Sequence, residues 1–164
     1  MGLFDMFKKK DAAPSFPVVL AADAAGAFVK MEDIPDEVFA QGILGPGCGI
    51  EPTGDTVYAP FDGTVTQIAT TLHAVGITSN DGIELLIHVG MDTVDMKGQG
   101  FTVLVKENQK VTAGTPLLKV DLDAIRAAGH PTATAIIVTN GDDLGELKML
   151  AEGDVAPGTP LFKV

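Results

Sequence analysis

The sequence has little cysteine and no long apolar run, and each scarcity excludes a class of protein. Cys48 is the only cysteine among 164 residues, so no internal disulfide can form, which is typical of a reducing compartment. No apolar run approaches the roughly 18 residues of a transmembrane helix, and the N-terminus lacks a signal-peptide apolar region. We therefore expect a cytoplasmic protein.

Positive charge is also scarce. The chain has 11 lysines and arginines against 22 aspartates and glutamates, a formal net charge of -11 at pH 7. A surface of this sign repels the phosphates of nucleic acid and attracts a basic protein surface. The composition therefore predicts a basic protein partner and no nucleic acid.

Residues 1–15 differ from the rest of the chain and read as a flexible N-terminal tail and linker. Apolar residues recur there at helical spacing before a run of lysines: Leu3, Phe4, Met6 and Phe7, then Lys8, Lys9 and Lys10. A short amphipathic, basic helix can sit weakly on an anionic membrane surface, so we expect transient contact of residues 1–10 with the inner face of the membrane. The alternative is a frayed terminus, because so short a helix is marginal alone.

From residue 16 onward, short apolar runs alternate with turn residues. This pattern predicts one all-β domain over residues 16–164, an antiparallel β-sandwich or barrel-like fold with a few short helices. The expected strands are residues 16–20, 26–30, 47–52, 56–59, 63–71, 74–78, 83–89, 100–105, 116–121, 135–139 and 160–164. The expected helices are residues 35–40 and 122–128, the second capped by Asp121 or Asp123 and ended by Gly129, with a turn near 144–147.

An internal repeat indicates a duplicated β architecture. Residues 111–120 (VTAGTPLLKV) match residues 155–164 (VAPGTPLFKV) at seven of ten positions. Each copy reads as a turn that begins a strand. The repeat is too short for a solenoid and predicts two similar strand and turn units within one fold.

Two of the three histidines lie in a predicted β-hairpin whose turn contains Ser79-Asn80-Asp81-Gly82. If residues 80 and 81 form a two-residue loop, His73 lies directly opposite His88, with Cβ atoms roughly 4.5 to 5.5 Å apart. If the loop is residues 81 and 82, the histidines are diagonal neighbours on one face. Both registers bring the imidazoles within reach of one small group, and a slip of one residue would break the pairing.

Thr71 precedes His73 by two residues and is expected on the same face of the strand. A neutral imidazole can act as a nucleophile while its neighbour donates a hydrogen bond to developing charge. The same two histidines can instead supply half of a zinc coordination shell. On the second strand Ile83, Leu85, Ile87 and Val89 share the face that we expect in the core.

The motifs resemble the glucose-type IIA component of the bacterial phosphoenolpyruvate-dependent sugar phosphotransferase system over nearly the whole chain. The histidine-centred motif is specific, whereas the APFDGTV stretch is also found in biotinyl-type domains. The matching stretches are MGLFD at 1–5, EDIPD at 32–36, APFDGTV at 59–65, TLHA at 71–74, GIELLIHVGMDTV at 82–94 and KGQGF at 97–101.

The resemblance implies a β-sandwich phosphocarrier whose phosphoryl-accepting nucleophile is His88. The histidine-containing phosphocarrier protein HPr donates the phosphoryl group, and a cysteine of a sugar-specific IIB domain accepts it. His73 matches the residue that stabilises the phosphoryl group, and Thr71 matches its hydrogen-bond partner. Asp36 and Asp92 match carboxylates that face basic HPr, and no cofactor is required.

The resemblance also implies an apolar, partner-binding patch around the histidines, formed by Val38, Phe39, Leu44 and Leu86. Ala69 and Leu86 stand where enteric members have aromatic residues, and Glu37 replaces an apolar residue. A patch recognises its partners through shape. These departures bear on the regulatory partners of enteric relatives more than on phosphotransfer.

Two other classes remain as alternatives. A zinc peptidase on a related β scaffold needs a third ligand, and the only other histidine, His130, is expected in a loop. A biotinyl or lipoyl carrier needs a lysine on an exposed hairpin, and Met96-Lys97-Gly98 is a poor version of that turn. The sequence does not identify the sugar, because a IIA domain contacts proteins and not sugar.

Overall fold

The computed structural model describes residues 19–21 and 24–163. The predicted N-terminal helix and linker lie outside these ranges, as does most of the strand expected at 16–20. None of the helices in these ranges has the length and apolar character needed to cross a bilayer.

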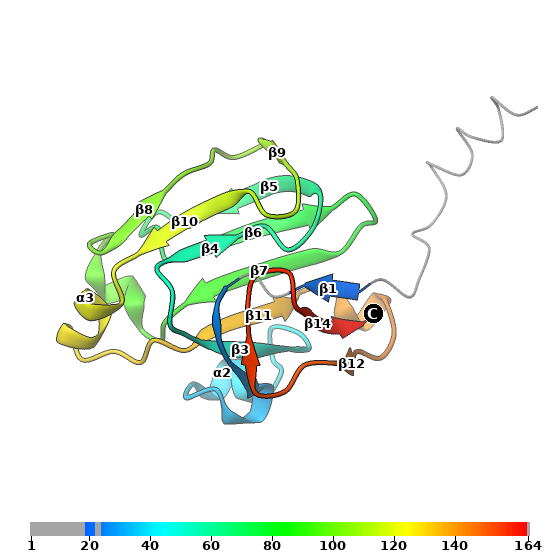
Figure 1. The fold of residues 1–164 in the computed structure, drawn as a ribbon, viewed down its shortest axis with the longest axis horizontal. Coiled ribbons are helices and arrows are strands. Elements are labelled where there is room, and N and C mark those ends of the chain that lie inside the picture. Colours follow the sequence, from blue (N-terminus) through cyan, green and yellow to red (C-terminus); the bar gives the residue numbers. More distant parts are fainter. Residues whose placement is uncertain (1–18, 22–23, 164) are drawn as a thin grey trace, which may run out of the picture.

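The strands form one large and two small sheets, and every pairing between them is antiparallel (Figure 1). The eight-stranded sheet has the order β13-β2-β3-β11-β7-β6-β5-β9. In that order its strands are Asp154–Val155, Gly26–Lys30, Gly47–Pro52, Thr134–Val138, Glu84–Val89, Ala74–Ser79, Gly63–Ile68 and Lys110–Val111. The three-stranded sheets are β4 (Thr56–Tyr58), β10 (Pro116–Val120) and β8 (Phe101–Val103), and β1 (Val19–Ala21), β14 (Pro160–Lys163) and β12 (Lys148–Met149).

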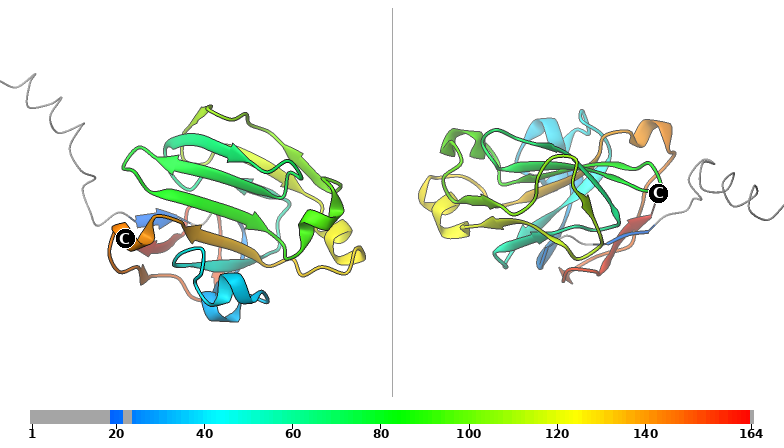
Figure 2. Two further views of the ribbon diagram at one scale, coloured as in Figure 1. Left: turned by 180° about the vertical axis from the view of Figure 1, so that it is seen from behind. Right: turned by 90° about the horizontal axis from the view of Figure 1, so that it is seen from above.

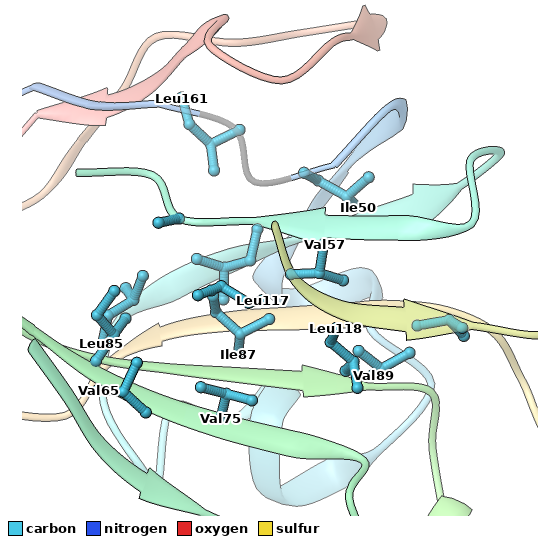
Figure 3. Close-up of a cluster of buried hydrophobic side chains, with 14 of the residues drawn as sticks. Ile50, Val57, Val65, Val75, Leu85, Ile87, Val89, Leu117, Leu118 and Leu161 are labelled. Carbon is cyan, nitrogen blue, oxygen red and sulfur yellow. The ribbon is translucent and has the colours of Figure 1, made fainter. Parts of the chain in front are cut away.

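The small sheets lie against one face of the large sheet, which gives the two layers seen in Figure 2. Figure 3 shows Val65, Val75 and Ile87 of the large sheet facing the side chains of β10. Both Leu117 and Leu118 of β10 are buried, because the register shifts between Pro116 and Leu118. This core is the main source of stability, since fully burying one such side chain contributes roughly 1.5 to 3 kcal/mol.

A second, smaller apolar cluster lies on the other face of the large sheet. Ala135 and Ile137 belong to it, whereas Ile136 and Val138 of the same strand belong to the main core. Helix α2 (Glu37–Ala40) covers this face through its buried residue Phe39. The 3-10 helix η1 (Met31–Asp33) lies just before α2 in the chain. The histidine site is built on this second face.

The internal repeat corresponds to two matching strand-turn-strand units. In one unit Thr115 Oγ1 accepts from Thr112 N at 3.2 Å, and in the other Thr159 Oγ1 accepts from Ala156 N at 3.0 Å. The units are β9 with β10 and β13 with β14. Strands β9 and β13 form opposite edges of the large sheet, while β10 and β14 are the central strands of the two small sheets. The predicted duplication is therefore confirmed at the level of the fold.

The remaining elements correct several predicted boundaries. The strand expected at 63–71 ends at Ile68, and the helix expected at 35–40 begins at Glu37 because Asp36 is its N-cap. Helix α3 (Leu122–Ala127) is capped by Asp121 and is followed by Gly129 at φ 84°, as predicted. The turn expected near 144–147 is preceded by the 3-10 helix η3 (Gly141–Asp143). The two-residue strands β9, β12 and β13 were not predicted, because so short a run carries no periodicity.

Candidate functional site

His88 lies near the centre of the eight-stranded sheet. It is on β7, and its partners on the two adjacent strands are Ala74 and Ala135. These methyl groups flank the imidazole on the face that carries α2, so the ring has room to lie there. As predicted, Ile83, Leu85, Ile87 and Val89 point to the opposite face and are buried in the main core.

The hydrogen bond of His88 defines the state of its ring. Nδ1 of His88 lies 2.9 Å from the carbonyl oxygen of Gly90. Because a carbonyl can only accept, Nδ1 carries the proton and donates it. The other ring nitrogen, Nε2, therefore keeps its lone pair in the neutral imidazole, which is the form of the ring that can act as a nucleophile.

The Gly90 carbonyl is held in place by a backbone conformation that requires glycine. Gly90 has φ 72°, and a Cβ there would lie 2.5 Å from Cγ2 of Thr93 and 3.0 Å from the carbonyl oxygen of Pro131. Thr93 is completely buried, and its hydroxyl donates to the carbonyl of Val89 at 2.6 Å. Sequence reasoning did not assign a role to Gly90, although its place two residues after His88 is the local signal for it.

His73 reaches His88 from the turn that precedes β6. The centroids of the two rings are 4.7 Å apart and their planes meet at 80°. Leu72 has φ 64° within this turn, and the carbonyl of His73 accepts from Val89 N at 2.8 Å. Oγ1 of Thr71 lies 2.8 Å from Nδ1 of His73. The structure therefore brings together the two imidazoles and the hydroxyl that the sequence singled out.

The predicted register of this hairpin was wrong. His88 pairs with Ala74 and not with His73, and Ser79 N donates to the carbonyl of Ile83 around a three-residue loop. Gly82, at φ 96°, supplies the left-handed residue of that loop. The pairing of the rings survives because His73 and Thr71 precede the first residue of β6. In this turn the alternation of faces along a strand does not apply, so the predicted shared face was wrong as well.

Burial favours the neutral form of both imidazole rings. The pKa of His88 is lowered to about 4, mainly by burial and also by the neighbouring His73, whereas the bond to Gly90 and the charge of Asp36 act in the other direction. Burial also lowers the pKa of His73, and hydrogen bonding at Thr71 opposes that shift. A neutral, partly buried imidazole with a free Nε2 is suited to nucleophilic attack.

The predicted partner-binding residues occupy different positions around this pair. Phe39 contacts His88 with ring centroids 4.9 Å apart. Asp36 caps α2 by accepting from Val38 N and Phe39 N, and Leu86 is half-buried in the small apolar cluster. Val38 and Leu44 are exposed, as is Asp92, which precedes the 3-10 helix η2 (Thr93–Met96).

Within the described ranges, no hydrogen bond or ring contact joins Val38, Leu44 or Asp92 to either histidine. Five further large apolar residues that the partner-binding prediction had not included are exposed in the described structure: Ile43, Val94, Leu104, Met149 and Leu150.

The two histidines do not provide enough ligands for the zinc site considered as an alternative. In the part of the chain that the structure describes, no group of three or more His, Cys, Asp or Glu side chains is placed to hold a metal ion. Nδ1 of each histidine is already hydrogen-bonded, so only two nitrogens could bind a metal. A catalytic zinc needs about three protein ligands. These residues alone do not fit a zinc site.

Comparison with known proteins decides the family. Residues 18–144 match the family model of the phosphoenolpyruvate-dependent sugar phosphotransferase system, EIIA 1. The chain belongs to this family. Its members are phosphotransferase components, and the chain is accordingly a phosphocarrier of the sugar phosphotransferase system.

Two kinds of curated relative resemble this EIIA chain. The glucose-specific EIIA component of Staphylococcus aureus (strain COL) is 40% identical over 156 residues, which cover 93% of this chain and 94% of the relative. The glucose-specific EIICBA component of Streptococcus pneumoniae serotype 4 is 45% identical over 141 residues, which cover 86% of this chain and 19% of the relative. The chain thus spans only about a fifth of the length of the multi-component relatives, which join an EIIA part to others in one protein.

A solved structure supports the β-sandwich architecture of this EIIA chain. Glucose permease IIA from Mycoplasma capricolum superposes with a TM-score of 0.83 at 31% identity, covering 91% of this chain and 96% of the other. The biotinyl or lipoyl alternative required Lys97 at the tip of a hairpin. Lys97 instead follows η2, and the strands on either side of it, β7 and β8, belong to different sheets.

Proposed function

We propose that Nε2 of His88 accepts a phosphoryl group from phospho-HPr and passes it to the cysteine of a sugar-specific IIB domain. The observation that carries this assignment is the bond from Nδ1 of His88 to the Gly90 carbonyl, which leaves Nε2 unprotonated beside a second imidazole. The low pKa of His88 keeps that nitrogen available at neutral pH.

Acceptance forms one N–P bond and breaks another. The lone pair of Nε2 attacks phosphorus as the bond to the HPr histidine breaks, and the electron pair of that bond returns to the HPr ring. The His88 ring becomes cationic because Nδ1 keeps its proton, and the Gly90 carbonyl stabilises this charge through the hydrogen bond at 2.9 Å. In the second step the IIB thiolate attacks phosphorus, and the Nε2–P bond returns its electrons to a neutral imidazole.

His73 supports the phosphoryl group through a chain of hydrogen bonds. If the Thr71 hydroxyl donates to Nδ1 of His73, the proton of the neutral His73 ring lies on Nε2. That N–H then donates to a phosphoryl oxygen on the neighbouring ring. Thr71 is therefore a positioning residue, while His73 contacts the transferred group.

The surroundings of the histidines supply a surface for two successive partners. Asp36 and Asp92 attract the basic surface of HPr, while Val38, Phe39, Leu44 and Leu86 contact both HPr and IIB. Relatives named EIICBA join EIIA to EIIB and EIIC parts in one chain, which supports a IIB acceptor. Relatives named glucose-specific favour glucose as the sugar. Phosphoenolpyruvate is a metabolite of the cell interior, so we place this exchange in the cytoplasm, with residues 1–10 touching the membrane surface.

Phosphorylation with enzyme I, HPr and phosphoenolpyruvate tests the assignment. We expect the wild type to gain an acid-labile phosphoryl group and to pass it to at least one IIB domain of a panel. His88→Ala should accept none, because the nucleophilic nitrogen is lost. His130→Ala is the matched control, since His130 lies in the loop between α3 and β11 and should leave acceptance unchanged. Normal phosphorylation of His88→Ala would overturn the assignment.

A further inference from the structure

A large groove, whose lining includes neither His73 nor His88, lies between the strand and 3-10 helix at residues 28–33 and the segment at 141–153. Its volume is about 1120 Å³. Its apolar lining includes Phe28, Met31, Pro46, Leu147, Met149 and Leu150. Met149 and Leu150 are 39% and 42% exposed, so the described chain leaves this apolar surface open to solvent.

The rim of the groove is acidic. One lysine, Lys30, lines the groove together with five exposed carboxylate residues, Glu32, Asp33, Asp142, Glu146 and Glu152. An occupant that buries apolar side chains here is therefore favoured if it also carries positive charge.

The chain itself carries a segment of this chemistry. Residues 3–10 (LFDMFKKK) contain four large apolar side chains, three lysines and one aspartate. Three lysines beside five carboxylates give charge complementarity, and the apolar side chains match the apolar lining.

The segment is tethered close to the groove. Lys163 of β14 pairs with Val19 on one side and with Lys148 on the other, and Figure 1 shows β1, β14 and β12 side by side. Two strand spacings place the Val19 and Lys148 backbones about 10 Å apart. Lys148 lies between the lining residues Leu147 and Met149. The nine residues from Lys10 to Val19 span up to about 30 Å, so the tether reaches the groove.

We propose that residues 3–10 dock in this groove of the same chain. Leu3, Phe4, Met6 and Phe7 contact the apolar lining, and the three lysines face the carboxylate rim. Docking occupies the same apolar side chains that a membrane surface would bind, so the two states exclude each other. A docked population of about 80% would lower the apparent membrane affinity of the segment about fivefold. The proposal does not depend on the phosphocarrier role.

Backbone amide shifts of the full-length protein in solution test the docking. We expect the amides of Met31, Leu147 and Met149 to shift between the wild type and the variant Phe4→Ser with Phe7→Ser. The His88 amide should stay unchanged. Ala12→Ser with Ala13→Ser is the matched control in the tether and should leave the groove amides as in the wild type. Identical chemical shifts of the groove amides in the wild type and in the phenylalanine variant would overturn the proposal.

The acidic rim and the occupant are tested separately. Glu146→Gln with Glu152→Gln should move the groove shifts toward those of the phenylalanine variant, whereas Glu107→Gln with Asp123→Asn removes the same charge elsewhere and should not. If the difference in groove amide shifts between the wild type and the phenylalanine variant becomes smaller on tenfold dilution, a second copy supplies the segment, which contradicts docking within one chain. Binding of anionic vesicles by residues 3–10 with no change at the groove amides would contradict it as well.

Discussion

One proton decides what the His88 ring can do. The Gly90 carbonyl holds that proton on Nδ1, and burial keeps a second proton off Nε2. A bond from a carboxylate in place of the carbonyl would favour the protonated ring and weaken the nucleophile. The choice of a neutral acceptor therefore matters for function.

Replacing His73 should separate the two transfers. We expect His73→Gln to accept a phosphoryl group from HPr while onward transfer to the IIB cysteine slows by roughly 10- to 1000-fold, because an oriented donor to developing charge is lost. Rapid-quench measurement of each half-reaction checks this. Thr71→Val, which removes only the hydroxyl that orients His73, should show a smaller loss in the same step. Unchanged onward transfer in His73→Gln would remove His73 from the mechanism.

The low pKa of His88 predicts how stability depends on pH. An unfolded histidine gains a proton below its ordinary pKa of about 6.5, whereas folded His88 stays neutral to a pKa of about 4. The unfolded chain therefore binds more protons in this window. Above pH 6.5 His88 is neutral in both states and does not change the free energy of unfolding with pH. As the pH drops from 6.5 to 4, His88 lowers the free energy of unfolding by about 3 kcal/mol.

Urea unfolding at several pH values between 7.5 and 4.5 measures this loss. The variant His88→Gln should lose less stability across the same range, and the difference between the two curves isolates His88 from the carboxylates. Parallel curves would show that burial does not hold the ring neutral. The lowered pKa also predicts phosphoryl acceptance that persists to pH 5.

At the scale of elements, the turns on either side of the β6–β7 hairpin position the site. Gly90→Ala should lower the free energy of unfolding by roughly 1 to 3 kcal/mol more than Gly129→Ala. Both glycines have positive φ, but only at Gly90 would a Cβ meet neighbouring atoms within 4 Å. Urea denaturation compares the two variants. Equal losses would show that left-handed strain alone, and not crowding against Thr93, makes glycine necessary.

The same substitution should disturb the ring of His88. A displaced carbonyl no longer holds the proton on Nδ1, so the tautomer population seen by nitrogen NMR should change in Gly90→Ala and not in Gly129→Ala. An unchanged tautomer in Gly90→Ala would show that the carbonyl position tolerates a methyl group.

The hairpin shows what sequence reasoning could and could not supply. Alternation of apolar residues correctly assigned Leu85, Ile87 and Val89 to the core, because period-2 burial depends only on the strand itself. The register depended on loop length, and a loop with Gly82 as its third residue differs by one position from a two-residue loop. The approach of His73 depended on a left-handed Leu72, for which the sequence carries no signal because leucine rarely adopts that conformation.

At the scale of the whole molecule, net charge should guide the donor. The double change Asp36→Asn with Asp92→Asn should lower the association rate with HPr and flatten its salt dependence, because exposed charges steer encounter and are screened within about 8 Å at physiological salt. Asparagine also caps helices, so α2 should persist. Stopped-flow measurements at several salt concentrations give both quantities.

A matched variant separates local from overall charge. The double change Asp142→Asn with Asp143→Asn removes the same amount of charge at η3. This 3-10 helix follows the C-terminal end of β11, whereas the residue that pairs with His88 is near the N-terminal end of that strand. The association rate of this variant should be nearly unchanged. If both double variants reduce the association rate equally, the net charge of -11, and not Asp36 and Asp92 in particular, attracts the donor.

The short edge strands of the large sheet bear on aggregation. Unpaired edges are templates on which another chain can add a strand. Here both edges, β9 and β13, are only two residues long, and in each repeat unit the chain turns away at once toward the opposite layer. An incoming strand therefore finds few unpaired backbone groups in a row. The duplicated unit consequently protects an eight-stranded sheet from edge-to-edge polymerisation at high protein concentration.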